Sequence, residues 1–167
     1  EIDLPDSVTE IGESAFNQCS SLKTIKLPAG VQKIGQYAFY MCKSLETADL
    51  SQITHIGDYA FYGCQALTSI DIPEGVETIS KYAFSYCNTL GSIKLPSTLK
   101  SIGEQTFYTN CNSVWVYCKA TTPPTLGTKA FNVNKSLSLF VPRTLLNVYG
   151  SSEWVTTYSA RINPYTF

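Results

Sequence analysis

Two aspartates, Asp49 and Asp71, have the spacing in this chain that most resembles a catalytic pair. They hold the same place in the matching phrases ADL and IDI. If each phrase is one rung of a repeating structure, the two carboxylates lie roughly 5 Å apart, as in a retaining glycosidase, and they would also suit calcium. Any outward column of a repeat protein gives that separation, however, and Lys26 and Lys94 bracket the pair. We therefore expect a solvated column here.

The six cysteines raise the question of a metal site or of disulfides. Metal knuckles need closely spaced pairs, whereas five of these cysteines are widely and almost evenly spaced, and Cys118 falls where other repeats carry a strand leucine. The five are Cys19, Cys42, Cys64, Cys87 and Cys111. The spacing predicts a column of small, buried, reduced thiols, because a disulfide between rungs would have to distort the stack. No metal or cofactor is expected.

His55 is the only histidine, so a Ser-His-Asp triad would have to use it. It occupies the position that Lys33 holds in the preceding repeat, which is an exposed one, and no nucleophile elbow surrounds it. We expect a surface histidine and no enzyme. A glycan-active enzyme that uses Asp49 and Asp71 remains an alternative.

A repeated phrase explains these spacings. Residues 34–42 read IGQYAFYMC and residues 56–64 read IGDYAFYGC. The phenylalanine of this phrase recurs at nearly constant intervals, at Phe16, Phe39, Phe61, Phe84, Phe107 and Phe131. Leucine, Ile-Gly and cysteine columns follow the same period. A period within roughly 20–29 residues predicts a leucine-rich repeat solenoid, in which stacked units share one core.

The repeat unit, L-x-x-I-x-L-P-x-x-V-x-x-I-G-x-x-A-F-x-x-C, resembles that of the BspA-type leucine-rich repeat family. The resemblance covers residues 1–142, and LFVPRTLLNVYGSSEW resembles that family's closing segment. It implies a curved, surface-exposed binding module of a secreted or cell-surface bacterial protein. Some members of the family are associated with adhesion to host matrix proteins such as fibronectin.

We expect a right-handed solenoid of parallel strands over residues 1–142. Alternating phrases such as TIKL, ended by proline, predict the strands. These are residues 2–4, 25–27, 48–50, 70–72, 93–95, 116–118 and 139–141. The V-x-x-I-G phrase should be a second extended segment, and x-x-A-F-x-x-C a turn of α- or 3₁₀-helix. The third repeat lacks the Pro-x-Gly turn and should have a tighter loop.

After Pro142 the period stops, and residues 143–167 carry apolar residues at helical spacing. These residues are Leu146, Tyr149, Trp154, Val155 and Tyr158. A solenoid must cover its last core layer, so this segment predicts a C-terminal cap. The opening EIDLP is already mid-pattern, and we expect a longer precursor.

Aromatic residues are frequent on the expected surface. One column is Tyr37, Tyr59 and Tyr82, and another is Tyr40, Tyr62 and Tyr108, with Tyr86 one place on. Tyrosines in such columns either pack laterally or form a contact surface. Near the C-terminal end, Trp115, Tyr117 and Phe140 replace small and charged residues. Either the cap covers them, the favoured interpretation, or they form a patch suited to a peptide or sugar.

The small net charge of the chain argues against two classes of partner. With 12 basic and 13 acidic residues the net charge is −1, which gives no footprint for nucleic acid or an anionic membrane, and no apolar run could span a bilayer. We expect a monomeric, non-catalytic module that adheres to an extracellular protein or glycan. The candidate binding residues are Lys26, Asp49, Asp71, Lys94, Trp115, Tyr117, Phe140, Tyr37, Tyr59 and Tyr82. The alternative from another class is a structural spacer.

Overall fold

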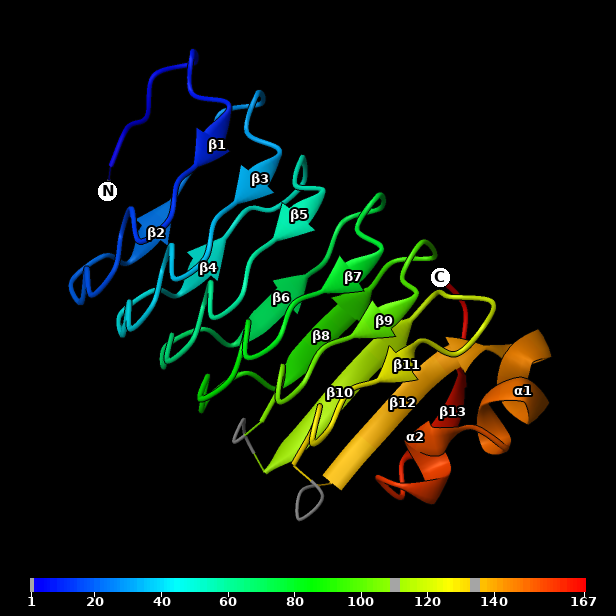
Figure 1. The fold of residues 1–167 in the computed structure, drawn as a ribbon. Coiled ribbons are helices and arrows are strands. Elements are labelled where there is room, and N and C mark those ends of the chain that lie inside the picture. The colour runs from blue at the N-terminus through cyan, green and yellow to red at the C-terminus, as the bar shows by residue number, and fades with distance from the viewer. Residues whose placement is uncertain (1, 109–111, 133–135) are drawn as a thin grey trace.

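Each repeat forms one rung of a parallel solenoid and contributes a short strand to each of two rows, which run side by side along the stack (Figure 1). The computed structural model describes residues 2–108, 112–132 and 136–167. One row is a six-stranded parallel sheet. Its strands are β1 (Glu10–Ile11), β3 (Lys33–Ile34), β5 (His55–Ile56), β7 (Thr78–Ile79), β9 (Ser101–Ile102) and β11 (Thr125–Leu126). These strands are the V-x-x-I-G phrases, so the second extended segment is confirmed.

The other row contains the strands that end in proline phrases. It comprises a two-stranded sheet, β2 (Thr24–Ile25) and β4 (Thr47–Ala48), and a five-stranded sheet. The five-stranded sheet consists of β6 (Ser69–Asp71), β8 (Ser92–Leu95), β10 (Ser113–Cys118), β12 (Ser136–Pro142) and β13 (Arg161–Tyr165), and all its pairings are parallel. Inward side chains such as Ile70, Ile93 and Val116 are buried and in register. The predicted solenoid and its period are confirmed, although residues 2–4 form no strand.

The A-F turn differs from the expected helical turn. Cys42 N–H donates to Phe39 O at 3.2 Å, a 3₁₀-type bond, but the left-handed φ of Tyr37 (56°) and Met41 (57°) interrupts any helix. Alternate N–H groups leave the turn altogether: Phe39 N–H donates to Ala60 O of the next rung at 2.7 Å. The prediction of helix is wrong because these donors bond between rungs.

A ladder of phenylalanine rings fills the core along the whole stack. Successive rings from Phe16 to Phe131 are stacked with centroids 5.0–5.6 Å apart. At the C-terminal end the last ring, Phe131, meets Trp154 at 5.3 Å and Tyr158 at 5.8 Å. The cap therefore continues the aromatic core for one further layer.

The cap comprises η1 (Arg143–Leu145), α1 (Leu146–Gly150) and α2 (Glu153–Thr156), which lie at the C-terminal end of the stack (Figure 1). Buried hydrogen bonds attach it: the Tyr149 hydroxyl donates to Ala120 O at 2.9 Å, and Trp154 Nε1 donates to Pro124 O at 3.1 Å. In the part of the chain that the structure describes, no helix is long and apolar enough to cross a membrane.

Strand β13 corrects one expectation. The period does not stop at Pro142, because β13 pairs in parallel with β12, Ser138 opposite Arg161 and Leu139 opposite Ile162. The repeat interval therefore persists through the cap. Ile162 extends the inward column that Leu139 belongs to, which is why the strand docks in this register.

The short third repeat leaves the stack unbroken, as expected, since β5 pairs with both β3 and β7. Ser51 N–H donates to Asp49 Oδ1 at 3.0 Å, and Ile53 N–H donates to Leu50 O at 2.8 Å. A carboxylate-stabilised turn thus stands where the neighbouring repeats have Pro28 with Gly30 and Pro73 with Gly75.

In the described part of the cysteine column, the side chains lie within the turns: Cys42, Cys64 and Cys87 are buried, and Cys19 on the first rung is half-buried. The buried thiols donate to phenylalanine carbonyls of the preceding rung, Cys42 to Phe16 O at 3.1 Å and Cys87 to Phe61 O at 3.2 Å. The described cysteines are free thiols, and Cys111 lies outside the described residues. Burial raises the pKa of Cys42 to about 11 and that of Cys87 to about 12. The described ranges hold no group of three or more His, Cys, Asp or Glu side chains that could hold a metal ion.

Replacing Phe61 should test the ladder. Phe61 is fully buried, so Phe61→Ala should lower the free energy of unfolding by about 3–5 kcal/mol. Tyr62 is half-buried and stacks on Tyr40 at 5.0 Å, so Tyr62→Ala should cost only about 1–2 kcal/mol. Urea titration measures both variants, and equal losses would contradict the assignment of Phe61 to the core.

The thiol column also predicts a pH dependence. The pKa of Cys42 and Cys87 is raised on folding, so their contribution to stability is complete below about pH 9 and is lost as the pH rises towards 11–12. Each thiol adds a slope of up to about 1.4 kcal/mol per pH unit in that window. Urea titrations from pH 8 to 11 should therefore show falling stability.

A double variant, Cys42→Ala with Cys87→Ala, is the control for this slope. It lacks both thiols but keeps every tyrosine and lysine that titrates in the same range. Its stability should fall less steeply than that of the wild type above pH 9. An unchanged slope would show that burial of these thiols does not cause the alkaline loss.

Candidate functional site

The outward face of the five-stranded sheet holds five of the ten predicted binding residues: Asp71, Lys94, Trp115, Tyr117 and Phe140. The ladder register arranges its outward side chains in two rows that cross the strands. The Trp115 row is Ser69, Ser92, Trp115, Ser138 and Arg161. The Tyr117 row is Asp71, Lys94, Tyr117, Phe140 and Asn163. Because the rows follow from backbone pairing, each side chain has fixed neighbours on both sides.

In the Tyr117 row, neighbouring side chains form an ion pair and a stacked pair of rings. Lys94 Nζ lies 3.0 Å from Asp71 Oδ2, in an exposed ion pair. Tyr117 and Phe140 stack with centroids 4.7 Å apart and planes 16° apart. Tyr165, from the end of β13, packs edge-on against both rings at 5.0 and 6.0 Å. For Tyr117 and Phe140, the expectation that the C-terminal segment packs against them is met in part.

Trp115 is different, and the favoured expectation that the cap covers it is wrong. Its side chain is 53% exposed. It extends from the middle of β10, and its ladder neighbours on β8 and β12 are Ser92 and Ser138. The cap does not cover it because β13 places Arg161 beyond Ser138 in this row, and its aromatic residue, Tyr165, two rows further on, opposite Pro142.

Two shallow hollows lie on this side of the sheet. One, of about 400 Å³, includes Lys94, Tyr117 and Tyr165 in its lining; the other, of about 360 Å³, includes Asp49 and Glu74. Asp71 and Lys119 line both, so the two hollows adjoin, and together they are called the groove. Asp49 and Asp71 thus share a hollow, which the sequence did not indicate. Lys26 lies outside both hollows, and its side chain is exposed just beyond β2.

The acidic end of the groove is held by ion pairs and hydrogen bonds. Glu74 accepts hydrogen bonds from Ser97 N–H and Oγ, at 3.1 and 2.8 Å, and Lys119 Nζ lies 3.9 Å from it. Burial alone would raise the pKa of Glu74, but the Ser97 bonds and the Lys119 charge lower it overall. Glu74 is therefore ionised near neutral pH, whereas a glycosidase acid needs a raised pKa.

The tyrosine columns lie on the A-F turns. Tyr37 stacks on Tyr59 at 5.0 Å, and Tyr59 on Tyr82 at 4.6 Å. All three have a left-handed φ of 56–58°, which costs a bulky residue roughly 1 kcal/mol or more. Stacking along the column offsets that cost and gives each ring a partner, as the lateral-packing interpretation predicts. A binding role for Tyr37, Tyr59 and Tyr82 stays a prediction.

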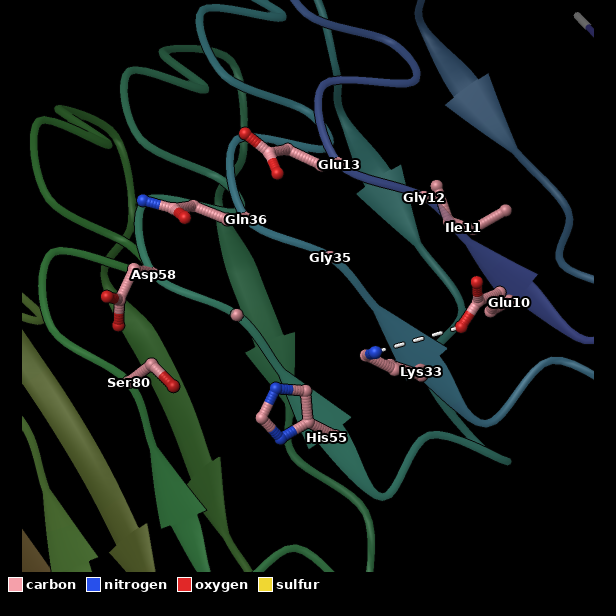
Figure 2. Close-up of a pocket in the computed structure, with 11 residues that line it drawn as sticks. Glu10, Ile11, Gly12, Glu13, Lys33, Gly35, Gln36, His55, Asp58 and Ser80 are labelled. Atoms are coloured by element: carbon pink, nitrogen blue, oxygen red, sulfur yellow. Dashed lines mark ion pairs between the residues drawn. The ribbon is translucent and has the colours of Figure 1, made fainter.

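A third hollow, of about 400 Å³, lies along the six-stranded sheet (Figure 2). Its wall includes Glu10, Lys33 and His55 from successive strands, and the ion pair drawn there joins Lys33 to Glu10 at 3.8 Å. His55 is exposed and in register with Lys33, as predicted. Figure 2 shows its ring apart from the side chain of Asp58, which follows on the same rung, and from that of Ser80 on the next rung, and the three form no triad.

Sequence reasoning missed several residues of the sheet face. Tyr165 and Phe167, whose rings meet at 4.9 Å, were included in the cap and given no surface role. Ser92 and Ser138 were not predicted as site residues, and the strand register places them on either side of Trp115. One signal was available: Arg161 follows Ser138 by the same interval that separates the phenylalanines of neighbouring repeats.

A parallel solenoid with inward leucine and isoleucine columns defines a leucine-rich repeat protein. More narrowly, the chain belongs to the BspA type leucine rich repeat family, whose model matches residues 1–114 and 54–159, with six copies of the repeat. The resemblance seen in the sequence is thereby confirmed.

Two solved structures are similar to the chain. A leucine-rich cell surface protein from Faecalibacterium prausnitzii A2-165 shares 35% identity over 82% of this chain, with a TM-score of 0.69. A leucine-rich repeat protein from Bacteroides ovatus ATCC 8483 shares 24% identity over 98% of it, with a TM-score of 0.47. The chain spans 37% and 51% of those proteins respectively. A comparison with curated proteins found no match.

Proposed function

We propose that the chain is a non-catalytic binding module of a bacterial cell-surface protein, and that it adheres to an extracellular ligand through the outward face of the five-stranded sheet. The observation that carries this proposal is Trp115, an indole 53% exposed in the middle of the sheet. Exposing so large an apolar surface contributes nothing to folding. Tryptophan is also among the residues that most often dominate binding energy.

The architecture supports an extended contact. A solenoid repeats its outward positions on every rung, and here the aromatic face and the groove continue across several strands. A location outside the cell is supported by the similarity to the Faecalibacterium prausnitzii cell surface protein. The ligand would belong to a host or to a neighbouring cell.

Charge on this face predicts how binding should respond to salt. Lys94 is paired with Asp71 and Lys119 lies near Glu74, while Asp49 adds a third carboxylate, so the groove carries only a small net negative charge. Long-range steering of a charged partner should therefore be weak. Affinity should be modest, should depend mainly on the aromatic side chains and should change little with ionic strength.

A spacer is the second candidate, and the stacked rings favour it. The phenylalanine ladder and the tyrosine columns run through neighbouring rungs without interruption, which would make the module stiff. A rigid rod that holds another domain away from a surface needs nothing more. It does not need Trp115, however, which is why binding is the first proposal.

The proposal is tested by screening extracellular matrix proteins and glycans by biolayer interferometry at two salt concentrations. Against any ligand found, Trp115→Ala should lower affinity by at least tenfold, as expected when a central aromatic contact is lost. Tyr86→Ala is the matched control, because Tyr86 is also exposed, at 42%, but lies on the A-F turns. That variant should bind like the wild type.

The other outcomes identify the alternatives. Loss of affinity in Tyr86→Ala with unchanged binding by Trp115→Ala would move the site to the tyrosine columns. Failure of the wild type to bind anything in the screen would favour the spacer. Thermal unfolding by circular dichroism checks that both variants fold: Trp115→Ala should be nearly as stable as the wild type, whereas Tyr86→Ala loses a ring contact with Tyr62 at 5.1 Å and should be slightly less stable.

A further inference from the structure

We infer that the Trp115 row is a subsite for a sugar ring of a neutral glycan chain. The inference rests on the proposed function, since it names the ligand of the same face. It comes from the pattern of side chains around the indole: Trp115 is flanked by Ser92 and Ser138, and beyond these lie Ser69 and Arg161. A large flat ring thus stands among three serines, with Arg161 at the far end of the row.

Small neighbours leave room beside the indole. Strands in a sheet are about 4.8 Å apart, so the next position beyond each serine is almost 10 Å from β10. Ring stacking needs only about 3.5–4 Å between carbon atoms. Tyr117 and Phe140 stack face to face across β10 and β12, which shows how rings stand on this sheet. An indole in the same orientation presents its two faces to the spaces above Ser92 and Ser138.

The chemistry of these spaces matches a pyranose ring. One face of such a ring is a patch of C–H groups that packs on an aromatic surface, while its hydroxyls project around the edge. A serine hydroxyl both donates and accepts a hydrogen bond, so Ser92 and Ser138 can satisfy a sugar hydroxyl in either direction. The three central residues carry no formal charge, which favours a neutral sugar.

The site continues beyond one ring. Ser92 also lines the hollow formed with Lys94, Tyr117 and Tyr165. Further sugar units can therefore follow from Trp115 into the groove. There, Lys94 and Lys119 lie among three carboxylates, those of Asp49, Asp71 and Glu74, so an anionic glycan would meet more carboxylates than ammonium groups. This excess of carboxylates again favours a neutral chain.

This face is less suited to binding an extended peptide. Peptides that bind to sheets usually add a strand and obtain their affinity from main-chain hydrogen bonds at an open edge. Strand β10 lies between β8 and β12 and is paired with both, so its backbone offers no edge beside Trp115. A ligand here must be recognised by side chains, as a glycan is.

The test uses neutral hexasaccharides of β-linked glucose, mannose and N-acetylglucosamine, with heparin and hyaluronan as anionic probes. Tryptophan emission gives a direct readout, because Trp115 is exposed whereas Trp154 is buried and hydrogen-bonded to Pro124 O. Stacking on Trp115 should shift the emission to shorter wavelength with at least one neutral hexasaccharide. Isothermal titration calorimetry should give a Kd of roughly millimolar or tighter, unchanged by added salt.

Variants separate the subsite from general adhesion. Trp115→Ala should abolish the emission shift and weaken the neutral oligosaccharide at least tenfold. Trp115→Tyr should keep part of the affinity, since it keeps a ring, and Tyr86→Ala should bind like the wild type. Ser92→Val with Ser138→Val keeps the indole but removes the hydroxyls, and should also weaken binding several-fold.

The outcomes distinguish the inference from the function on which it rests. Binding of a protein ligand that depends on Trp115 and survives removal of its glycans, with no response to any hexasaccharide, would overturn the glycan inference and leave the binding function standing. Salt-sensitive binding to heparin alone would also overturn it, as would oligosaccharide binding that Trp115→Ala leaves intact. No binding to any of these probes or to the protein screen would defeat both proposals.

Discussion

The structure depends on the contact between one A-F turn and the next. Phe39 N–H donates to Ala60 O at 2.7 Å, while the rings of Phe39 and Phe61 stack with centroids 5.0 Å apart. Backbone hydrogen bonds between parallel rungs set a distance of about 4.8 Å between them, and the spacing of the core side chains must match that distance. A flat ring stacked on its own kind meets that requirement, and Gly57 meets it elsewhere: a Cβ there would lie 2.7 Å from Gln36 N. A Cβ at Gly57 would need its neighbours to shift, although Ser80 occupies the equivalent position on the next rung without breaking the stack.

The features that recur on every rung are the ones that could be predicted from the sequence. The solenoid, its period, both rows of extended segments and the phenylalanine core are all repeated, so each could be recognised from several copies. The A-F turn was wrongly expected to be helical because composition does not tell whether the N–H groups of Phe39 and Met41 bond along the chain or to the next rung. Only assembly of the stack determines that. Strand β13 was missed since Ile162 alone carries the inward column there.

The outward face could be predicted only in part. The column of Asp71, Lys94 and Tyr117 follows from the period, and the register confirms that they are neighbours. The groove beside them could not be foreseen, because Glu74 and Lys119 follow the ends of their strands, where loop geometry decides where a side chain points. Nor does the period show what covers a residue. Tyr165 packs on Tyr117 and leaves Trp115 open, a difference that arises from the register of one cap strand.

The exposed aromatic residues of this chain differ in how much their contacts stabilise the fold. Tyr37, Tyr59 and Tyr82 have strained backbones, yet each ring stacks on the next, so their presence is explained by stacking. Tyr117 and Phe140 likewise form a pair. Trp115 stands between two serines and leaves more than half of its side chain in water. Ring stacking does not account for an indole at that position, and more than half of it is not buried, which is the physical ground for the proposal that Trp115 contacts a ligand.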